Sequence, residues 1–229
     1  METEVFSVSN ICKTQGDFIL DSVSLLAMKN DIIGLIGDNG AGKTTFLKII
    51  AQLIPIDSGE SNLPFQEKIG VVFDQLPFPG NLSIYELEEV LKRLFTAWDP
   101  TQFSYYIQLF KLPIDTPVKN FSKGMSMKLN IAVSLSHRAQ ILLLDELTSG
   151  LDPIVRIDIL NLIESYVKEN GATVVMSTHI LDDIDKIATK VVLMHNGKFI
   201  LQKEMRDIPD MYYLEKSFKE ILDKQGEYN

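Results

Sequence analysis

Nine consecutive residues near position 40 have the types and spacing that bind phosphate. The pattern G-x-x-x-x-G-K-[ST] is typical of a loop whose glycines let backbone N–H groups turn toward phosphate oxygens, at the positive end of the following helix. Lys43 can reach the terminal phosphates, and the hydroxyl of Thr44 can bind Mg²⁺. This segment therefore predicts a nucleoside triphosphate site, with the candidate binding residues Gly37, Asp38, Asn39, Gly40, Ala41, Gly42, Lys43, Thr44 and Thr45.

Two carboxylates follow a second apolar segment. Ile141–Leu144 is a purely apolar run that predicts a buried strand, and Asp145 and Glu146 come directly after it. A carboxylate at a strand end beside a phosphate loop can hold Mg²⁺, because hard cations prefer oxygen ligands. The next carboxylate, Glu146, is placed to orient and deprotonate a water molecule that attacks the γ-phosphate.

Two further segments carry polar side chains at the ends of predicted elements. His179 follows the apolar strand Thr173–Ser177, so it is expected at the same sheet edge as Asp145. Ser122 and the backbone amides around Gly124 precede a helix predicted over Ser126–Ser136, which is a second arrangement able to hold an anion. Because the chain already has one phosphate loop, this second site indicates a second nucleotide-binding face.

Taken in order, these segments resemble the motifs of ATP-binding cassette (ABC) ATPases over nearly the whole chain. Gly37–Thr44 is similar to Walker A, Ile141–Asp145 to Walker B, and Ser149–Asp152 to the D-loop. Ser122–Met125 has the sequence S-K-G-M and resembles the family signature L-S-G-G-Q. This variant is similar to bacterial exporter ATPases near the bacitracin and lantibiotic group.

The resemblance implies specific roles, cofactors and partners. Glu146 corresponds to the catalytic glutamate, His179 to the switch histidine at the γ-phosphate, and Lys43 to the Walker A lysine. ATP and Mg²⁺ are the implied cofactors. A second ABC ATPase subunit, identical or homologous, would pack head to tail, so that each signature covers the other subunit's ATP. The residues expected to bind ATP in this way are Ser122, Lys123, Gly124 and Asp152.

Three positions depart from the family pattern. Gln15 stands where many relatives have a tyrosine that stacks on adenine; Phe18 could replace that ring, or base stacking is weak. At the Q-loop, Asp74 and Gln75 are both candidate Mg²⁺ ligands, and the sequence does not distinguish them. Leu147 replaces the usual proline after the catalytic glutamate, which makes the turn less rigid but removes no reacting group.

Composition limits the classes of protein and partner. The chain has 229 residues, with 22 Lys and Arg against 31 Asp and Glu, a net charge of −9 and one cysteine, Cys12. The acidic balance argues against a nucleic-acid partner, and the single cysteine fits a reducing compartment. The acidic start lacks the pattern of a signal peptide, and no apolar run approaches the length of a membrane span.

These features favour the nucleotide-binding subunit of a bacterial exporter, held on the cytoplasmic face of the membrane by a separate permease. The alternative in the same family is a non-transport ABC ATPase that acts on ribosomes or DNA. Such proteins usually carry two cassettes or a long coiled coil. A regulatory module that holds ATP without hydrolysis is a second alternative. The presence of Lys43, Asp145, Glu146 and His179 argues against it.

The periodicity predicts an α/β fold, namely a P-loop NTPase core of the ABC type with an antiparallel β region and an inserted helical lobe. We expect one domain over 1–229, with a core over about 1–75 and 123–206, a lobe over about 76–122 and a tail over 207–229. The expected elements include a strand over Asp31–Ile36, helices over Thr44–Leu53, Phe103–Phe110 and Pro153–Asn170, a helix from Ser83 toward Phe95, and one near Tyr212–Leu222. Asn196-Gly197 predicts a hairpin turn between Val191–Met194 and Phe199–Leu201.

Overall fold

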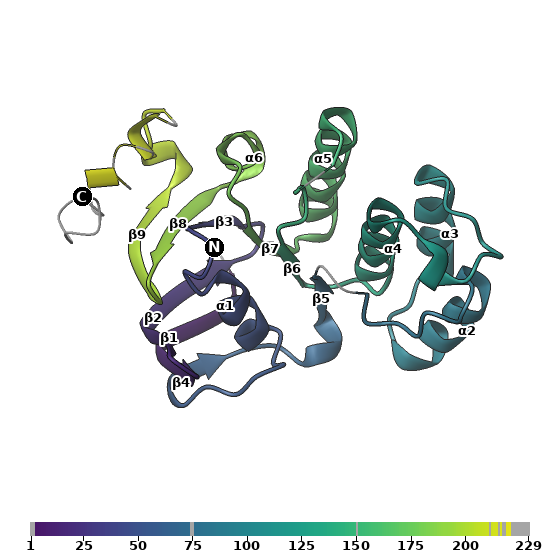
Figure 1. The fold of residues 1–229 in the computed structure, drawn as a ribbon, viewed down its shortest axis with the longest axis horizontal. Coiled ribbons are helices and arrows are strands. Elements are labelled where there is room, and N and C mark those ends of the chain that lie inside the picture. The colour runs from purple at the N-terminus through teal and green to yellow at the C-terminus, as the bar shows by residue number, and fades with distance from the viewer. Residues whose placement is uncertain are drawn as a thin grey trace.

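The computed structural model describes residues 3–73, 76–149, 151–210, 212–214, 216 and 219–220. These residues form two β-sheets with helices packed between and around them (Figure 1). Within this part of the chain, no helix is long and apolar enough to cross a membrane.

The larger sheet has the strand order β5-β6-β7-β3-β8-β9. The first five strands in this order, β5, β6, β7, β3 and β8, are parallel to one another, and β9 is antiparallel to β8. Asp145 at the end of β6 pairs with Ser177 at the end of β7, so the carboxyl ends of these strands meet at one edge. The strands are β3 (Ile32–Ile36), β5 (Ile69–Val72), β6 (Ile141–Asp145), β7 (Thr173–Ser177), β8 (Lys190–His195) and β9 (Lys198–Glu204).

Both faces of this sheet are buried, which explains why its central strands have apolar residues at consecutive positions. On one face, Leu142 and Leu144 belong to a core shared with α4 (Lys123–Ser136), α5 (Pro153–Asn170) and α6 (Leu181–Ile187). On the other face, Ile141 and Leu143 belong to a second core, which includes α1 (Lys43–Ile50). Helix α1 therefore lies between the larger and the smaller sheet, as Figure 1 shows.

The smaller sheet is the predicted antiparallel β region. It has the order β2-β1-β4, with β1 (Glu4–Gln15), β2 (Phe18–Met28) and β4 (Ser58–Asn62). Its inward side chains, such as Phe6 and Leu20, are fully buried against α1 and the larger sheet.

Helices α2 (Ile84–Leu94) and α3 (Pro100–Leu109) lie beyond β5, on the far side of α4 in Figure 1. Ser83 and Glu86 form the predicted capping box of α2. The expected starts of the next two helices were wrong by three residues each. Helix α3 begins at Pro100 because Asp99 caps it, and α4 begins at Lys123 because the Ser122 side chain accepts a hydrogen bond from the N–H of Met125.

Other predicted boundaries are close to those observed. Helix α5 has the predicted bounds, with the Asp152 cap at its start and Gly171 in the left-handed region at its end. The β8–β9 turn has φ of 43° and 74° at Asn196 and Gly197, as a type I′ hairpin requires. In the tail, 212–214, 216 and 219–220 are helical, whereas Leu222 lies outside the described residues. Short 3₁₀ helices occupy Gln66–Lys68, Val118–Asn120 and Met205–Asp207.

Candidate nucleotide site

The phosphate loop connects β3 to α1, as its motif predicts. Gly42 has φ of 108° and precedes the first helical residue, and a Cβ there would lie 2.4 Å from the ring of Phe18. Only glycine allows both the backbone conformation and the close approach of that ring. Lys43 is buried, and its ammonium group donates hydrogen bonds to the carbonyls of Gly37 at 2.6 Å and Asp38 at 3.1 Å. The loop backbone thus binds the ammonium group of its own lysine.

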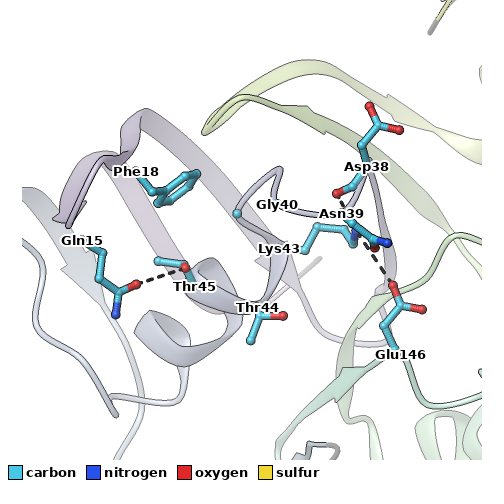
Figure 2. Close-up of a pocket in the computed structure, with 10 residues that line it drawn as sticks. Gln15, Phe18, Asp38, Asn39, Gly40, Lys43, Thr44, Thr45 and Glu146 are labelled. Atoms are coloured by element: carbon cyan, nitrogen blue, oxygen red, sulfur yellow. Dashed lines mark hydrogen bonds and ion pairs between the residues drawn. The ribbon is translucent and has the colours of Figure 1, made fainter.

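A cavity of about 340 Å³ opens over this loop (Figure 2). Most of the predicted phosphate-binding residues line it, together with the predicted catalytic carboxylate and two residues from the β1–β2 hairpin. Among the described residues the lining is Gln15, Phe18, Asp38, Asn39, Gly40, Gly42, Lys43, Thr44, Thr45 and Glu146. Segments more than a hundred residues apart in the sequence therefore meet at one cavity.

Asp145 lies beside the phosphate loop and is held by two hydroxyl groups. The hydroxyl of Thr44 donates to one carboxylate oxygen at 2.7 Å, and that of Ser177 donates to the other. These oxygen donors suit a hard cation such as Mg²⁺, which is usually bound by one or two carboxylates together with substrate phosphates and water. Among the described residues there is no group of three or more histidine, cysteine or acidic side chains that could hold a metal ion.

Glu146 makes contacts with two other segments. Its carboxylate lies 2.7 Å from Nδ1 of His179 and 3.9 Å from the ammonium nitrogen of Lys43. Its backbone has φ of 50°, a left-handed conformation that is uncommon for a residue with a side chain. The Glu146 N–H is bonded to the carbonyl and the hydroxyl of Ser177, at 3.1 and 3.0 Å, and these bonds fix the turn. The three predicted catalytic residues therefore converge at the sheet edge.

The signature residues lie elsewhere. Ser122 and Lys123 are exposed at the start of α4, and none of Ser122, Lys123 and Gly124 is among the described residues that line the cavity. Asp152 is also outside the lining, and its carboxylate caps α5 by accepting from the N–H of Ile154 at 2.9 Å. The signature residues therefore do not line the cavity over the phosphate loop, although Lys123 lines a small separate pocket together with Asp145 and Glu146.

Gln15 and Phe18, the two residues considered for stacking on adenine, both line the cavity. The side-chain oxygen of Gln15 accepts from the hydroxyl of Thr45 at 3.4 Å, and Phe18 is half-buried beside Gly42. Figure 2 shows that the two side chains come from the two ends of one hairpin turn above α1.

The structure describes only one of the other residues that depart from the family pattern. Leu147 is buried in the core, and Asp74, Gln75 and the D-loop residue Gly150 lie outside the described residues.

Sequence reasoning missed two residues that shape this site. Ser177 bonds both Asp145 and Glu146, and its position at the end of a buried strand next to β6 was the signal available. His195 lies at the end of β8, with Nδ1 3.6 Å from a carboxylate oxygen of Asp38 in the phosphate loop. That pairing depends on the order of β3 and β8 in the sheet, which local sequence does not specify.

Comparison with known proteins gives consistent matches. The family model described as "ABC transporter" matches residues 20–149. The chain is 35% identical over 209 residues to the lantibiotic transport ATP-binding protein SrtF of Streptococcus pyogenes, covering 87% of this chain and 91% of that protein. It is 29% identical to the bacitracin transport ATP-binding protein BcrA of Enterococcus faecalis, covering 89% and 70%.

Solved structures agree with the observed fold. An ATP-binding subunit of an ABC transporter superposes with a TM-score of 0.81 at 20% identity, covering 91% of this chain and 93% of that one. A dimeric ATP-binding cassette in a post-hydrolysis state, bound to ADP and Pi, gives 0.77 at 23% identity, covering 88% and 99%. The predicted family resemblance and fold class are confirmed.

Proposed function

From the premise that this chain belongs to the ABC transporter family and is an ATPase of that family, we propose that it is the nucleotide-binding subunit of a bacterial exporter. Two copies, or one copy and a homologous partner, enclose two ATP·Mg. Closure of the pair drives a separate membrane permease, and hydrolysis resets it. The observation that carries this proposal is the position of the Glu146 carboxylate between the ammonium group of Lys43 and the ring of His179.

The phosphate loop, Glu146 and His179 have proposed roles that their chemistry suits. The backbone amides of the phosphate loop and the ammonium group of Lys43 bind the phosphates. Glu146 orients and deprotonates the attacking water, and His179 contacts the γ-phosphate. The 2.7 Å contact between the Glu146 carboxylate and the His179 ring supports these two roles, because each group limits the orientations of the other.

Thr44 and Asp145 would hold Mg²⁺, with Asp74 or Gln75 as the proposed ligand from the Q-loop. Their oxygen atoms fit this cation, which would neutralise charge on the phosphates. Lys43 already supplies one fixed positive charge, so the chain and the cation would share the neutralisation.

The second half of each nucleotide site is proposed to come from a second subunit. A helix N-terminus is suited to an anion, and α4 begins at Ser122, Lys123 and Gly124. None of these three residues is among the described residues that line the cavity over the phosphate loop. The exposed position of Ser122 and Lys123 leaves them accessible to a partner's ATP. Asp152, at the start of α5, belongs to the same proposed interface.

The exporter assignment rests on relatives. Proteins 35% and 29% identical to this chain are named for lantibiotic and bacitracin transport.

We propose that the chain attaches to the cytoplasmic face of the membrane through a permease, which docks on the lobe near Asp74–Glu86. The acidic balance of the chain argues against a nucleic-acid partner.

Affinity capture of the tagged full-length chain from detergent-solubilised membranes tests the assignment. The expected result is a co-purifying multispanning membrane protein, together with Mg²⁺-dependent ATP hydrolysis by the captured complex. Recovery of the chain with ribosomes or DNA, and without any membrane protein, would instead favour the non-transport alternative.

A further inference from the structure

A buried carboxylate lies close to the proposed hydrolysis site without touching the cavity. Asp183 in α6 is completely buried, and it follows His179 by four residues. One of its carboxylate oxygens accepts from the hydroxyl of Thr148, and the other accepts from Nε of Arg156. We propose that Asp183 is a positioning residue, which holds the loops of Glu146, Asp152 and His179 in one arrangement.

The two partners of Asp183 belong to the loops that carry the other site residues. Thr148 follows Glu146 by two residues, and its carbonyl accepts from the N–H of Leu151 at 3.2 Å. Arg156 lies in the first turn of α5, and its N–H donates to the carbonyl of Asp152 at 2.9 Å. One carboxylate therefore links the loop after β6, the start of α5 and the start of α6.

The environment of Asp183 argues against a role in stability alone. The carboxylate is removed from water, and its neighbour Ile184 belongs to the large apolar core. Burying a charge has a desolvation cost that its partner often does not fully compensate, and apolar side chains of similar volume are commonly at least as stabilising. The ion pair between Asp183 and Arg156 instead restricts how α5 and α6 are oriented relative to each other, because a carboxylate and a guanidinium group pair only in a few geometries.

The residues that need orientation are themselves weakly constrained. His179 is exposed and Glu146 is half-buried, so neither is fixed by surrounding core packing. Their mutual contact at 2.7 Å depends on the relative placement of two loops from different strands. Ser177 already bonds the backbone of Glu146 at the end of β7, and the Asp183 network adds a side-chain connection from Thr148 and Arg156 to α6, the helix that follows His179. This inference rests on the proposed function, because it assumes the roles given to Glu146 and His179.

The test compares Asp183→Asn with the double variant Asp183→Leu/Arg156→Met in the full-length chain. Hydrolysis is measured at saturating Mg²⁺ and protein concentration, and thermal midpoints are measured in parallel. For Asp183→Asn we expect kcat to fall about tenfold or more, with KM within about threefold of the parent, because the phosphate loop is intact. The double variant should recover the thermal midpoint and keep the low kcat. Recovery of kcat together with the midpoint would show a purely structural role and overturn the proposal.

Two further variants keep the test decisive. Thr148→Val removes one hydroxyl and leaves the ion pair, so it should fold even where the others do not. It should lower kcat about threefold at constant KM, and an unchanged kcat would count against the network. Lys190→Met is the matched control, because Lys190 forms a half-buried ion pair with Asp31 at 2.8 Å at the opposite edge of the sheet. It should lower the midpoint and leave kcat unchanged; a matching loss of kcat would again indicate stability alone.

Glu146→Gln separates this inference from the proposed function. If Glu146→Gln is inactive and Asp183→Asn is fully active, only the positioning role fails. If Glu146→Gln hydrolyses ATP at the parental rate, the proposed assignment of the site fails, whatever Asp183→Asn does.

Discussion

The phosphate loop and the signature segment are both anion sites at helix N-termini, yet their surroundings differ. The phosphate loop is enclosed by its own chain: Lys43 is buried, and Glu146 reaches it from β6. The signature segment is exposed, and a Cβ added at Gly124 would meet nothing within 4 Å. The first site is therefore complete enough to bind nucleotide in one chain, whereas the second has open space that a partner can fill. The predictions below test this difference.

The largest effect is expected for Glu146→Gln. A positioned general base contributes about 100-fold to 10,000-fold to a rate, so hydrolysis should fall by about 100-fold or more. The amide keeps the volume of the side chain, and the phosphate loop is unchanged, so ATP still binds. The variant should accumulate as an ATP-bound dimer in gel filtration. A variant that stays monomeric at high concentration with ATP and hydrolyses at the parental rate would refute the role.

Gly124→Asp tests the signature segment without disturbing the monomer. The new side chain would project into open space near the start of α4, where a negative charge favours the helix dipole. The monomer should remain stable and bind ATP as before, but repulsion of a partner's phosphates should reduce turnover by about tenfold or more.

Thr101→Asp is the matched control for that variant, because Thr101 has the equivalent position near the start of α3. Equal activity of the two variants, measured at high protein concentration, would indicate that the signature segment binds no second nucleotide.

Local signals explain which parts of the molecule the sequence predicts. Helix α5 was predicted with its observed bounds because Asp152, Pro153 and Gly171 mark both of its ends. In contrast, β4 was not predicted, since all of its residues are exposed and it pairs only with the edge of β1. Its sequence, S-G-E-S-N, has no apolar alternation.

In the site too, features set by local sequence were predicted, whereas features set by contacts between distant segments were not. The phosphate loop motif is local, and seven of its nine residues are among the described residues that line the cavity. The left-handed backbone of Glu146 and the pairing of Asp183 with Arg156 depend on which strands and helices become neighbours. Pairwise contacts across 27 or more residues leave no periodic pattern in one sequence. Such contacts are found only once the fold is known.

The end of α4 opposite the signature segment should make the stability of the protein depend on pH. His137, at the end opposite the signature segment, is buried and stacks on Phe95 with ring centroids 4.3 Å apart. Burial lowers the pKa of His137 from 6.5 to about 4. The unfolded chain therefore binds more protons between these two values, and the free energy of unfolding should decrease as pH falls from about 6.5 to 4.

The His137 contribution reaches roughly 3 kcal/mol, at 1.36 kcal/mol per pKa unit. Urea unfolding of the parent and of His137→Phe at pH 7 and pH 4.5 measures it. Phenylalanine cannot titrate, so the variant should lose less stability than the parent on acidification. Identical losses would exclude His137 as the cause.

Lys43→Ala should weaken binding itself, unlike the glutamate variant. Hydrogen bonds to charged groups contribute about 1.5–3 kcal/mol, so we expect ATP affinity to fall by roughly 10-fold to 100-fold. Titration with a fluorescent ATP analogue measures this change. Lys48→Ala is the matched control, because Lys48 lies on the same helix and is absent from the described cavity lining. Equal affinities for the two variants would contradict the role of Lys43.

The smallest effect concerns the base, which the phosphate loop does not recognise. A base stacked on an aromatic ring gains about 1–3 kcal/mol by analogy with single-strand binding proteins. Gln15 has no ring, and the ring of Phe18 is held beside Gly42. We therefore expect GTP to support turnover within about tenfold of ATP, a difference of about 1.4 kcal/mol. Gln15→Tyr should tighten ATP binding by supplying a ring at the edge of the cavity.

Phe18→Leu is the variant that can overturn this expectation. Leucine keeps much of the packing against Gly42 but has no aromatic face, so it separates stacking on the base from support of the phosphate loop. We expect the dissociation constants for ATP and GTP to change by less than about threefold, in titrations at fixed Mg²⁺. A tenfold loss of ATP affinity with little change for inorganic triphosphate would show that Phe18 has replaced the missing tyrosine. The base would then be recognised from the second position of the same hairpin, and weak selectivity would be ruled out.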